Sequence, residues 1–145
     1  MVDELQLLGG WRLESAHVVD GETDIDRIMF GADPHGLLHY LSDGRMAVLI
    51  ADGGRTPFAN GRPLATNAEM LQAARTFTAY AGTFEGQGGR VVHHVDMNSY
   101  TNDIGVDYPR EARIDGDLLE LTTPPELPPG QSPMRLGWRR IGGRR

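Results

Sequence analysis

The chain has 145 residues, with 14 basic and 20 acidic side chains that give a formal net charge of −6. All of the basic residues are arginine, and neither lysine nor cysteine occurs. The composition therefore excludes Schiff-base and phosphate-loop lysines, thiol nucleophiles, disulfides and thiolate metal sites. The acidic balance argues against a nucleic-acid partner, because phosphate neutralisation needs a concentrated basic surface.

The length and a hydrophobic content of 39% indicate one folded domain over residues 1–145, with a lead-in at about 1–8 and a tail at 142–145. No apolar run approaches the roughly 20 residues of a membrane helix. The acidic start of the chain lacks the positive charge of a signal peptide. We therefore expect a cytoplasmic protein with no membrane partner.

The elements expected along the chain are mostly short strands. Apolar and polar residues alternate, as in half-buried strands, over 11–19, 37–41, 45–51, 78–85, 90–100, 106–114, 117–123 and 134–141. Asp-Gly pairs, which favour the tight turns of hairpins, occur at 20–21, 43–44, 52–53 and 115–116. Because barrel closure removes exposed sheet edges, we expect an all-β, up-and-down antiparallel barrel of about eight strands.

Two segments interrupt the strands. Residues 66–76 are mostly helix formers, and Thr66 with Glu69 has the spacing of a capping box. About ten helical residues span about 15 Å, close to the mouth of a small barrel. We therefore interpret this helix, with the loop 52–65 before it, as a lid over one end or as a passive plug. The proline-rich stretch 124–133 is expected to be a long connection.

The sequence resembles a known family in several ordered motifs. Gly10-Trp11, preceded by Gly9, resembles the Gly-x-Trp signature of lipocalins. The wider set is similar to the bacterial and fungal lipocalin-like domain family, a calycin-type small β-barrel, and comprises residues 36–40, 43–46, 58, 69, 80–84, 92–95, 110, 119–121 and 136–140. The resemblance implies a barrel with a central cavity, in which Arg135, Arg139 or Arg140 covers Trp11. It implies no particular reaction.

Alternation along the strands predicts which side chains face the barrel interior. In the strand 90–100 the more apolar face carries His93 and Met97, so His94 is expected to point outward. His94 and Asp96 share that outer face but have no third partner that would complete a metal site. The inner faces of the neighbouring strands are expected to carry the candidate residues Tyr80, Phe84, Tyr108, Arg110 and His17.

The candidate catalytic residues are His93, Arg110 and Tyr80. A buried arginine needs an anionic or carbonyl partner, and a histidine that titrates near neutrality can move a proton. The expected ligand-binding residues are His17, Tyr40, Met46, Phe58, Phe84, Met97 and Tyr108. Two alternatives remain open: His93 as a core histidine bonded to a carbonyl, and Arg110 turned outward by a bulge at Pro109. No metal or other cofactor is expected.

Three functions follow as hypotheses. The first is an enzyme of secondary metabolism that acts by acid–base chemistry, as an isomerase, cyclase or dehydratase, on a small, mostly apolar carbonyl compound. The polarity of the expected interior favours this reading. The second is a protein that only binds such a hydrophobic or amphipathic molecule. The third is an accessory protein with a filled barrel, and a homodimer is an open alternative for the assembly.

Overall fold

The computed structural model describes residues 2–19, 26–28, 30–126 and 133–142. The expected Asp20-Gly21 turn, residues 127–132 of the expected connection and residues 143–145 of the expected tail lie outside the described residues. The elements of the described part are, in chain order, α1 (Glu4–Leu7), β1 (Gly9–Val19), β2 (Asp26–Ile28), β3 (His35–Tyr40), β4 (Arg45–Ala51), the 3-10 helix η1 (Arg62–Leu64), α2 (Asn67–Arg75), β5 (Phe77–Gln87), β6 (Arg90–Asn98), the 3-10 helix η2 (Thr101–Asp103), β7 (Asp107–Asp115), β8 (Leu118–Thr122) and β9 (Met134–Arg140).

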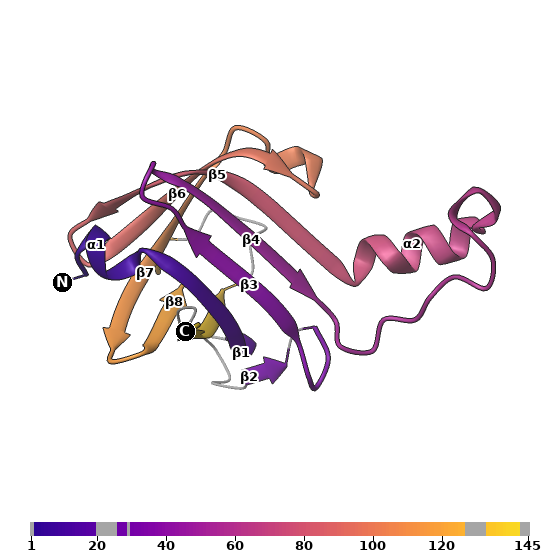
Figure 1. Cartoon of the computed structure of the whole chain (residues 1–145), viewed down its shortest axis with the longest axis horizontal. Coiled ribbons are helices and arrows are strands. Elements are labelled where there is room, and N and C mark those ends of the chain that lie inside the picture. Colours follow the sequence, from indigo (N-terminus) through magenta and orange to yellow (C-terminus); the bar gives the residue numbers. More distant parts are fainter. Residues whose placement is uncertain (1, 20–25, 29, 127–132, 143–145) are drawn as a thin grey trace.

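The strands form a closed antiparallel barrel (Figure 1). From β3 onward each strand pairs with the next along the chain, and β1 pairs with both β3 and β9. β1 and β3–β9 therefore make an eight-stranded barrel, which confirms the predicted up-and-down architecture. The short β2 pairs with the last residues of β1, beyond the part that pairs with β3. No helix in the described part of the chain is long and apolar enough to cross a membrane.

One end of the barrel is closed by α1 and by the start of β1. The Trp11 indole N–H donates to the Leu7 carbonyl oxygen at 2.8 Å. The Arg140 guanidinium carbon lies 4.2 Å from the centre of the Trp11 ring, and its Nη1 donates to the Leu8 carbonyl oxygen at 3.0 Å. Arg140 is thus the arginine that covers Trp11. The interior near this end is filled by buried side chains, among them Leu38, Tyr40, Met46 and Phe84.

A β-bulge at Glu14 reverses the alternation of β1. Leu13 pairs with Trp138 and Ser15 with Gly137, so Glu14 is the extra residue. An extra residue moves every later side chain to the opposite face. Ala16 is accordingly buried in the core, and His17 takes the opposite face of the strand. The expectation that His17 points into the interior is therefore wrong.

A second bulge, at Asp96, does the same to β6. Ala81 pairs with Met97 and Gly82 with Val95, so Asp96 has no partner in β5. His93 precedes the bulge and is fully buried, whereas Met97 follows it and is 61% exposed. The predicted inward orientation of His93 is confirmed, and that of Met97 is wrong. Asn98 takes the inward position instead.

Residues 52–76, called the arm below, project from the end of the β4–β5 hairpin. Their ends meet where the Asp52 N–H donates to the Thr76 carbonyl oxygen at 2.9 Å. Thr66 and Glu69 form the predicted capping box of α2. However, α2 has no buried residue, and Figure 1 shows it extending away from the barrel. It does not cover the barrel, contrary to the expected lid or plug.

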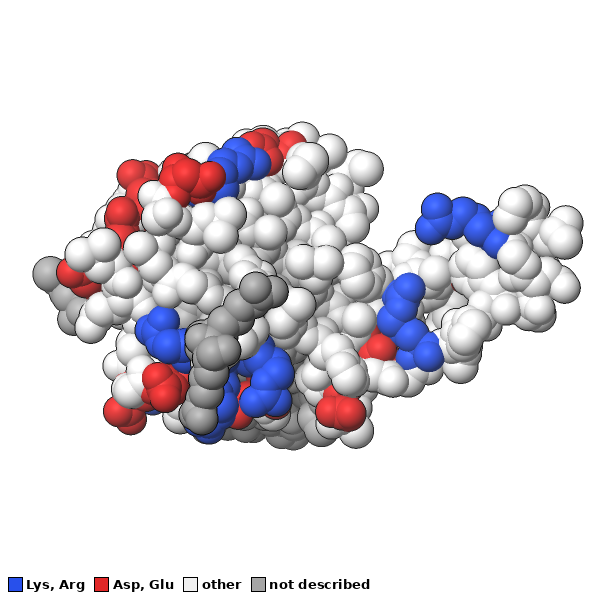
Figure 2. Space-filling view, in the orientation of Figure 1, with Lys and Arg blue, Asp and Glu red and all other residues white. Residues whose placement is uncertain are grey.

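Charged side chains lie mainly on the outside. Figure 2 shows acidic and basic groups mixed over the visible face of the barrel, with basic groups on the arm. Each bulged acid has an arginine partner: Arg45 binds both carboxylate oxygens of Asp96, at 2.7 and 3.2 Å, and Arg139 donates to Glu14. Among the described residues, Arg110 is the one arginine that is buried, and no buried aspartate or glutamate accompanies it.

Candidate ligand-binding cavity

A cavity of about 390 Å³ occupies the part of the barrel away from α1. Its volume lies in the range of small-molecule sites. Most of its wall is apolar, with Phe30, Val48, Ile50, Leu121, Met134, Leu136 and Trp138. Polar side chains gather at β5–β7 and the turn between β6 and β7, and comprise Thr78, Tyr80, Asn98, Tyr100, Asp103, Tyr108 and Arg110. The cavity therefore suits a mostly apolar molecule with a polar group at one side.

Arg110 lines this cavity from β7. Its side chain is buried, with 8% of the residue exposed. Its Nη1 donates to the Pro109 carbonyl oxygen at 2.8 Å, and its guanidinium carbon lies 4.9 Å from the centre of the Tyr108 ring. No carboxylate among the described residues pairs with it. Pro109 pairs regularly with Val92, so the alternative bulge does not occur and Arg110 faces inward as predicted.

Tyr108 is held by two polar neighbours near Arg110. Its hydroxyl donates to an Asp103 carboxylate oxygen and accepts from the Asn98 side-chain amide at 3.0 Å. Burial, followed by the hydrogen bond to Asp103, raises the pKa of Tyr108 well above its usual value. The Tyr108 hydroxyl is thus neutral, and its proton is already donated to Asp103. Its ring, rather than its hydroxyl, is what it offers to a ligand.

His93 lies between two tyrosines from different strands. Its Nε2 is 2.6 Å from the Tyr40 hydroxyl, and its Nδ1 is 2.7 Å from the Tyr80 hydroxyl. β3 supplies Tyr40 and β5 supplies Tyr80, whose ring packs edge-on against Tyr108 at 5.1 Å. The three residues form a hydrogen-bonded chain that runs from the filled interior to the cavity wall. The alternative of a histidine bonded to a carbonyl does not occur.

Burial and the nearby charge keep His93 neutral. Desolvation, followed by the positive charge of Arg110, lowers the pKa of His93 to about 3. Burial likewise raises the pKa of Tyr80 to about 12. At neutral pH this chain therefore consists of one neutral imidazole and two neutral phenols. It can donate and accept hydrogen bonds, but it carries no charge of its own.

The predicted site residues fall into three groups. Tyr80, Tyr108 and Arg110 line the cavity. His93, Tyr40, Met46 and Phe84 are buried but belong to the packed interior rather than to the cavity wall. His17, Met97 and Phe58 lie elsewhere: the first two are displaced by the bulges, and Phe58 belongs to the arm.

Some wall residues were missed by the sequence analysis. Unbroken alternation would put Asn98 on the outer face with His94, but the bulge at Asp96 turns it inward. Asp103 comes from the short η2 helix, which alternation does not describe. Trp138 lines the cavity from β9, and its indole nitrogen is buried without a hydrogen-bond partner among the described residues.

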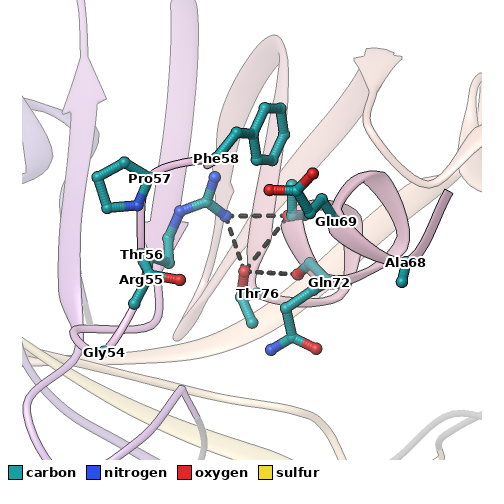
Figure 3. Close-up of a pocket in the computed structure, with 10 residues that line it drawn as sticks. Gly54, Arg55, Thr56, Pro57, Phe58, Ala68, Glu69, Gln72 and Thr76 are labelled. Atoms are coloured by element: carbon teal, nitrogen blue, oxygen red, sulfur yellow. Dashed lines mark hydrogen bonds between the residues drawn. The ribbon is translucent and has the colours of Figure 1, made fainter. Parts of the chain in front are cut away.

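A second hollow, of about 280 Å³, lies within the arm (Figure 3). There the Arg55 guanidinium donates to the Ala73 carbonyl oxygen and the Thr76 hydroxyl, both at 2.9 Å. Glu69 accepts from the backbone N–H groups of Ala59 and Thr66, at 2.9 and 3.0 Å. These polar groups hold the loop to α2, so the hollow is explained by the internal structure of the arm.

The outer histidine of β6 has structural partners. His94 bonds Asp107 at 2.7 Å and Glu85 at 2.9 Å. These bonds raise the pKa of His94. Asp96 bonds Arg45 instead, so the two residues do not act together. Among the described residues no cluster of three or more histidine, aspartate or glutamate side chains could hold a metal ion.

Fold and cavity together define a class of protein: a small barrel of the lipocalin type with a half-open interior. The model of the lipocalin-like domain family matches residues 8–141, and the chain belongs to this family. A curated relative is the 4'-hydroxy-3'-methoxypropiophenone carrier protein ppsC of Aspergillus oryzae, 41% identical over 66 residues. That alignment covers 40% of this chain and 60% of the relative.

Proposed function

We propose that this protein binds a small, mostly apolar molecule in its barrel and releases it unchanged, as a carrier does. The ligand class that fits is an aromatic ketone or a compound of similar shape. Its ring would fill the apolar part of the cavity, and its carbonyl oxygen would accept hydrogen bonds from the polar side. This is the second of the hypotheses drawn from the sequence.

The proposal rests on the burial of the Arg110 guanidinium with few hydrogen-bond partners. Among the described residues, the buried Arg110 guanidinium donates one hydrogen bond, to the Pro109 carbonyl oxygen, and a buried charge with so few partners is costly. Arginine keeps its charge at any pH and presents several N–H groups in a fixed plane. A ligand oxygen that accepts from this group would offset the cost. Partial or full negative charge on that oxygen would strengthen the bond.

The relative supports the choice of ligand class. Its name describes a carrier of an aromatic ketone. Such a compound joins an apolar ring to a carbonyl acceptor, which is the combination that this cavity offers. The aligned part spans 60% of the relative, so the ligand of this chain is proposed from the chemistry of its own cavity as well.

The acid–base hypothesis is less well supported by the position of His93. A general base must reach the proton that it removes, but both ring nitrogens of His93 are occupied by tyrosine hydroxyls. Tyr80 stands between the imidazole and the cavity. The filled-barrel hypothesis is less well supported by the cavity of about 390 Å³. Binding without turnover requires neither a free base nor a filled interior.

The test is a calorimetric titration with acetophenone, a small aromatic ketone. We expect saturable binding by the wild type and a loss of at least about tenfold in affinity for Arg110→Leu, the value of a charge-assisted hydrogen bond. Arg113→Leu is the matched control, because Arg113 lies on the same strand and is exposed. Equal affinity in all three proteins would contradict the proposal, as would conversion of the ketone during incubation.

A further inference from the structure

The chain of Tyr40, His93 and Tyr80 has a direction, and we infer that it holds the Tyr80 hydroxyl as a hydrogen-bond donor aimed at the ligand's acceptor oxygen. In this reading Tyr40 and His93 are positioning residues that never touch the ligand. The inference deepens the proposed function and rests on it for the ligand, but the direction of the chain is a property of the empty protein.

The neutral ring of His93 carries one N–H proton. A neutral imidazole has one N–H donor and one acceptor nitrogen. Both nitrogens of His93 lie within hydrogen-bond distance of a tyrosine hydroxyl. One tyrosine must therefore donate to the ring and the other must accept from it. The accepting tyrosine keeps a hydroxyl proton that the chain does not use.

The surroundings of the two hydroxyls decide which tyrosine keeps the unused proton. Tyr40 is 1% exposed, and its hydroxyl has no hydrogen-bond partner but His93 among the described residues. If Tyr40 accepted from Nε2–H, its own proton would be buried without a partner, which is unfavourable. Tyr80 lines the cavity, where a ligand or water can accept its proton. The favoured arrangement is Tyr40 O–H to Nε2, and Nδ1–H to the Tyr80 oxygen.

A ligand in the cavity would contact two hydrogen-bond donors, Tyr80 and Arg110. With its oxygen accepting from Nδ1–H, Tyr80 keeps its own O–H free to donate toward the cavity. Arg110 is also purely a donor, and the ring of Tyr108 contacts both, at 5.1 Å from the Tyr80 ring and 4.9 Å from the guanidinium carbon. Both groups can donate a hydrogen bond to an acceptor such as a ketone oxygen. Neither can do so to a hydrocarbon of the same shape.

The direct test needs no ligand. Long-range ¹H–¹⁵N spectra of histidine-labelled apo protein report which ring nitrogen carries the proton, and the spectrum of His93→Gln assigns the signals of His93. We expect the Nδ1–H tautomer, which is the less common form in free histidine, without change from about pH 5 to pH 8. An Nε2–H tautomer, or a protonated ring in this range, would overturn the inference.

The second test compares acetophenone with ethylbenzene, which has nearly the same shape and no acceptor. Tyr40→Phe removes the donor to Nε2 from a position outside the cavity wall, so the Nδ1–H form loses its advantage. We expect this variant to bind acetophenone about fivefold more weakly and ethylbenzene as the wild type does. Tyr80→Phe should show the same pattern.

The ethylbenzene titration distinguishes a positioning role of Tyr40 from a role in packing the core. A loss of both probes in Tyr40→Phe would mean that the hydroxyl acts through the shape of the core, and would overturn the inference. Unchanged acetophenone binding in Tyr40→Phe would overturn it as well. If the wild type bound neither probe, the proposed function would fail, while the tautomer measured in the apo protein would still decide the direction of the chain.

Discussion

Arg110 is the residue at which the proposed ligand binding would act against the stability of the fold. Its guanidinium is buried beside apolar walls, and Nη1 has one protein acceptor, the Pro109 carbonyl oxygen. The ring of Tyr108 contributes a cation–π contact. Both contacts are weak compensation for removing a full charge from water. A residue kept under such conditions is more readily explained by what it binds than by what it stabilises.

We therefore predict that Arg110→Leu makes the empty protein more stable while weakening its binding. The expected gain in the free energy of unfolding is about 1 kcal/mol or more, because an apolar side chain replaces a poorly partnered buried charge. Urea denaturation without ligand measures it, with the exposed Arg113→Leu as the control near zero. A clear loss of stability in Arg110→Leu would show that the guanidinium has a structural role.

The neutral His93 makes stability depend on pH. Its pKa is about 3 in the folded protein against 6.5 in the unfolded chain, so the unfolded state binds the extra proton between these values. The contribution of His93 is therefore complete above pH 6.5 and is lost as the pH falls toward 3. The loss approaches about 1.4 kcal/mol per pH unit for one proton.

Denaturation curves between about pH 5 and pH 6.5 test this prediction. His93→Gln should lower stability overall and remove this acid-side slope, because glutamine does not titrate. His94→Gln is the control, since the raised pKa of His94 acts with the opposite sign: its contribution is present below pH 6.5 and is lost as the pH rises. A slope that persists in His93→Gln and disappears in His94→Gln would contradict the assignment.

At the scale of the elements, the two bulges decide which side chains reach the interior. Glu14 and Asp96 are each an extra residue in one strand. Arg139 on the neighbouring β9 binds Glu14, and Arg45 on β4, which is separated from β6 by β5, binds Asp96. The second bulge exposes Met97 and brings Asn98 into the cavity. Gly82 allows β6 to approach closely at this bulge, because a Cβ at Gly82 would lie 1.9 Å from the His94 carbonyl oxygen.

Gly82→Ala should consequently destabilise the barrel by about 2 kcal/mol or more, since the clash is with backbone that cannot move aside easily. Thermal or urea denaturation measures the loss. Gly89→Ala is the matched control, because a Cβ at Gly89 would have open space around it. If the two alanine variants were equally stable, the bulge would not need the close approach that we describe.

The arm behaves as an insertion in the β4–β5 hairpin. Its ends are joined by the hydrogen bond from Asp52 to Thr76, and the regular pairing stops at Ala51 and Phe77. Replacing residues 53–75 with a short Gly-Ser loop should leave the barrel folded and acetophenone affinity within about twofold, because α2 buries no residue and the loop need only span the hairpin end. A large loss of affinity would restore the lid interpretation.

How much the sequence predicts depends on how local the deciding interactions are. Alternation within regular strands was enough to place Arg110, Tyr80 and His93 inside, and the capping residues Thr66 and Glu69 were enough to start α2. A one-residue bulge leaves little trace in a strand of mixed composition, so His17 and Met97 were misplaced. The partners of His93 come from β3 and β5, and only the closed barrel brings them together.

At the scale of the whole molecule, the barrel has two halves with different tasks. The half near α1 is filled, with Trp11 between the Leu7 carbonyl and the Arg140 guanidinium. The other half keeps the cavity, with Trp138 in its wall. The filled half contains Tyr40 and His93, and their hydrogen bonds lead to Tyr80 at the cavity wall. We propose that a small ligand enters this second half and leaves unchanged.

The indole N–H signals of the two tryptophans can report this binding directly. The two side chains give the protein two indole N–H signals, one from each half of the barrel. On titration with acetophenone we predict a saturable shift of the Trp138 signal, little change in the Trp11 signal, and full recovery of unaltered ketone. A carrier role would be ruled out if neither signal moved up to the solubility limit of the ketone, if the Trp11 signal alone moved, or if the ketone were converted.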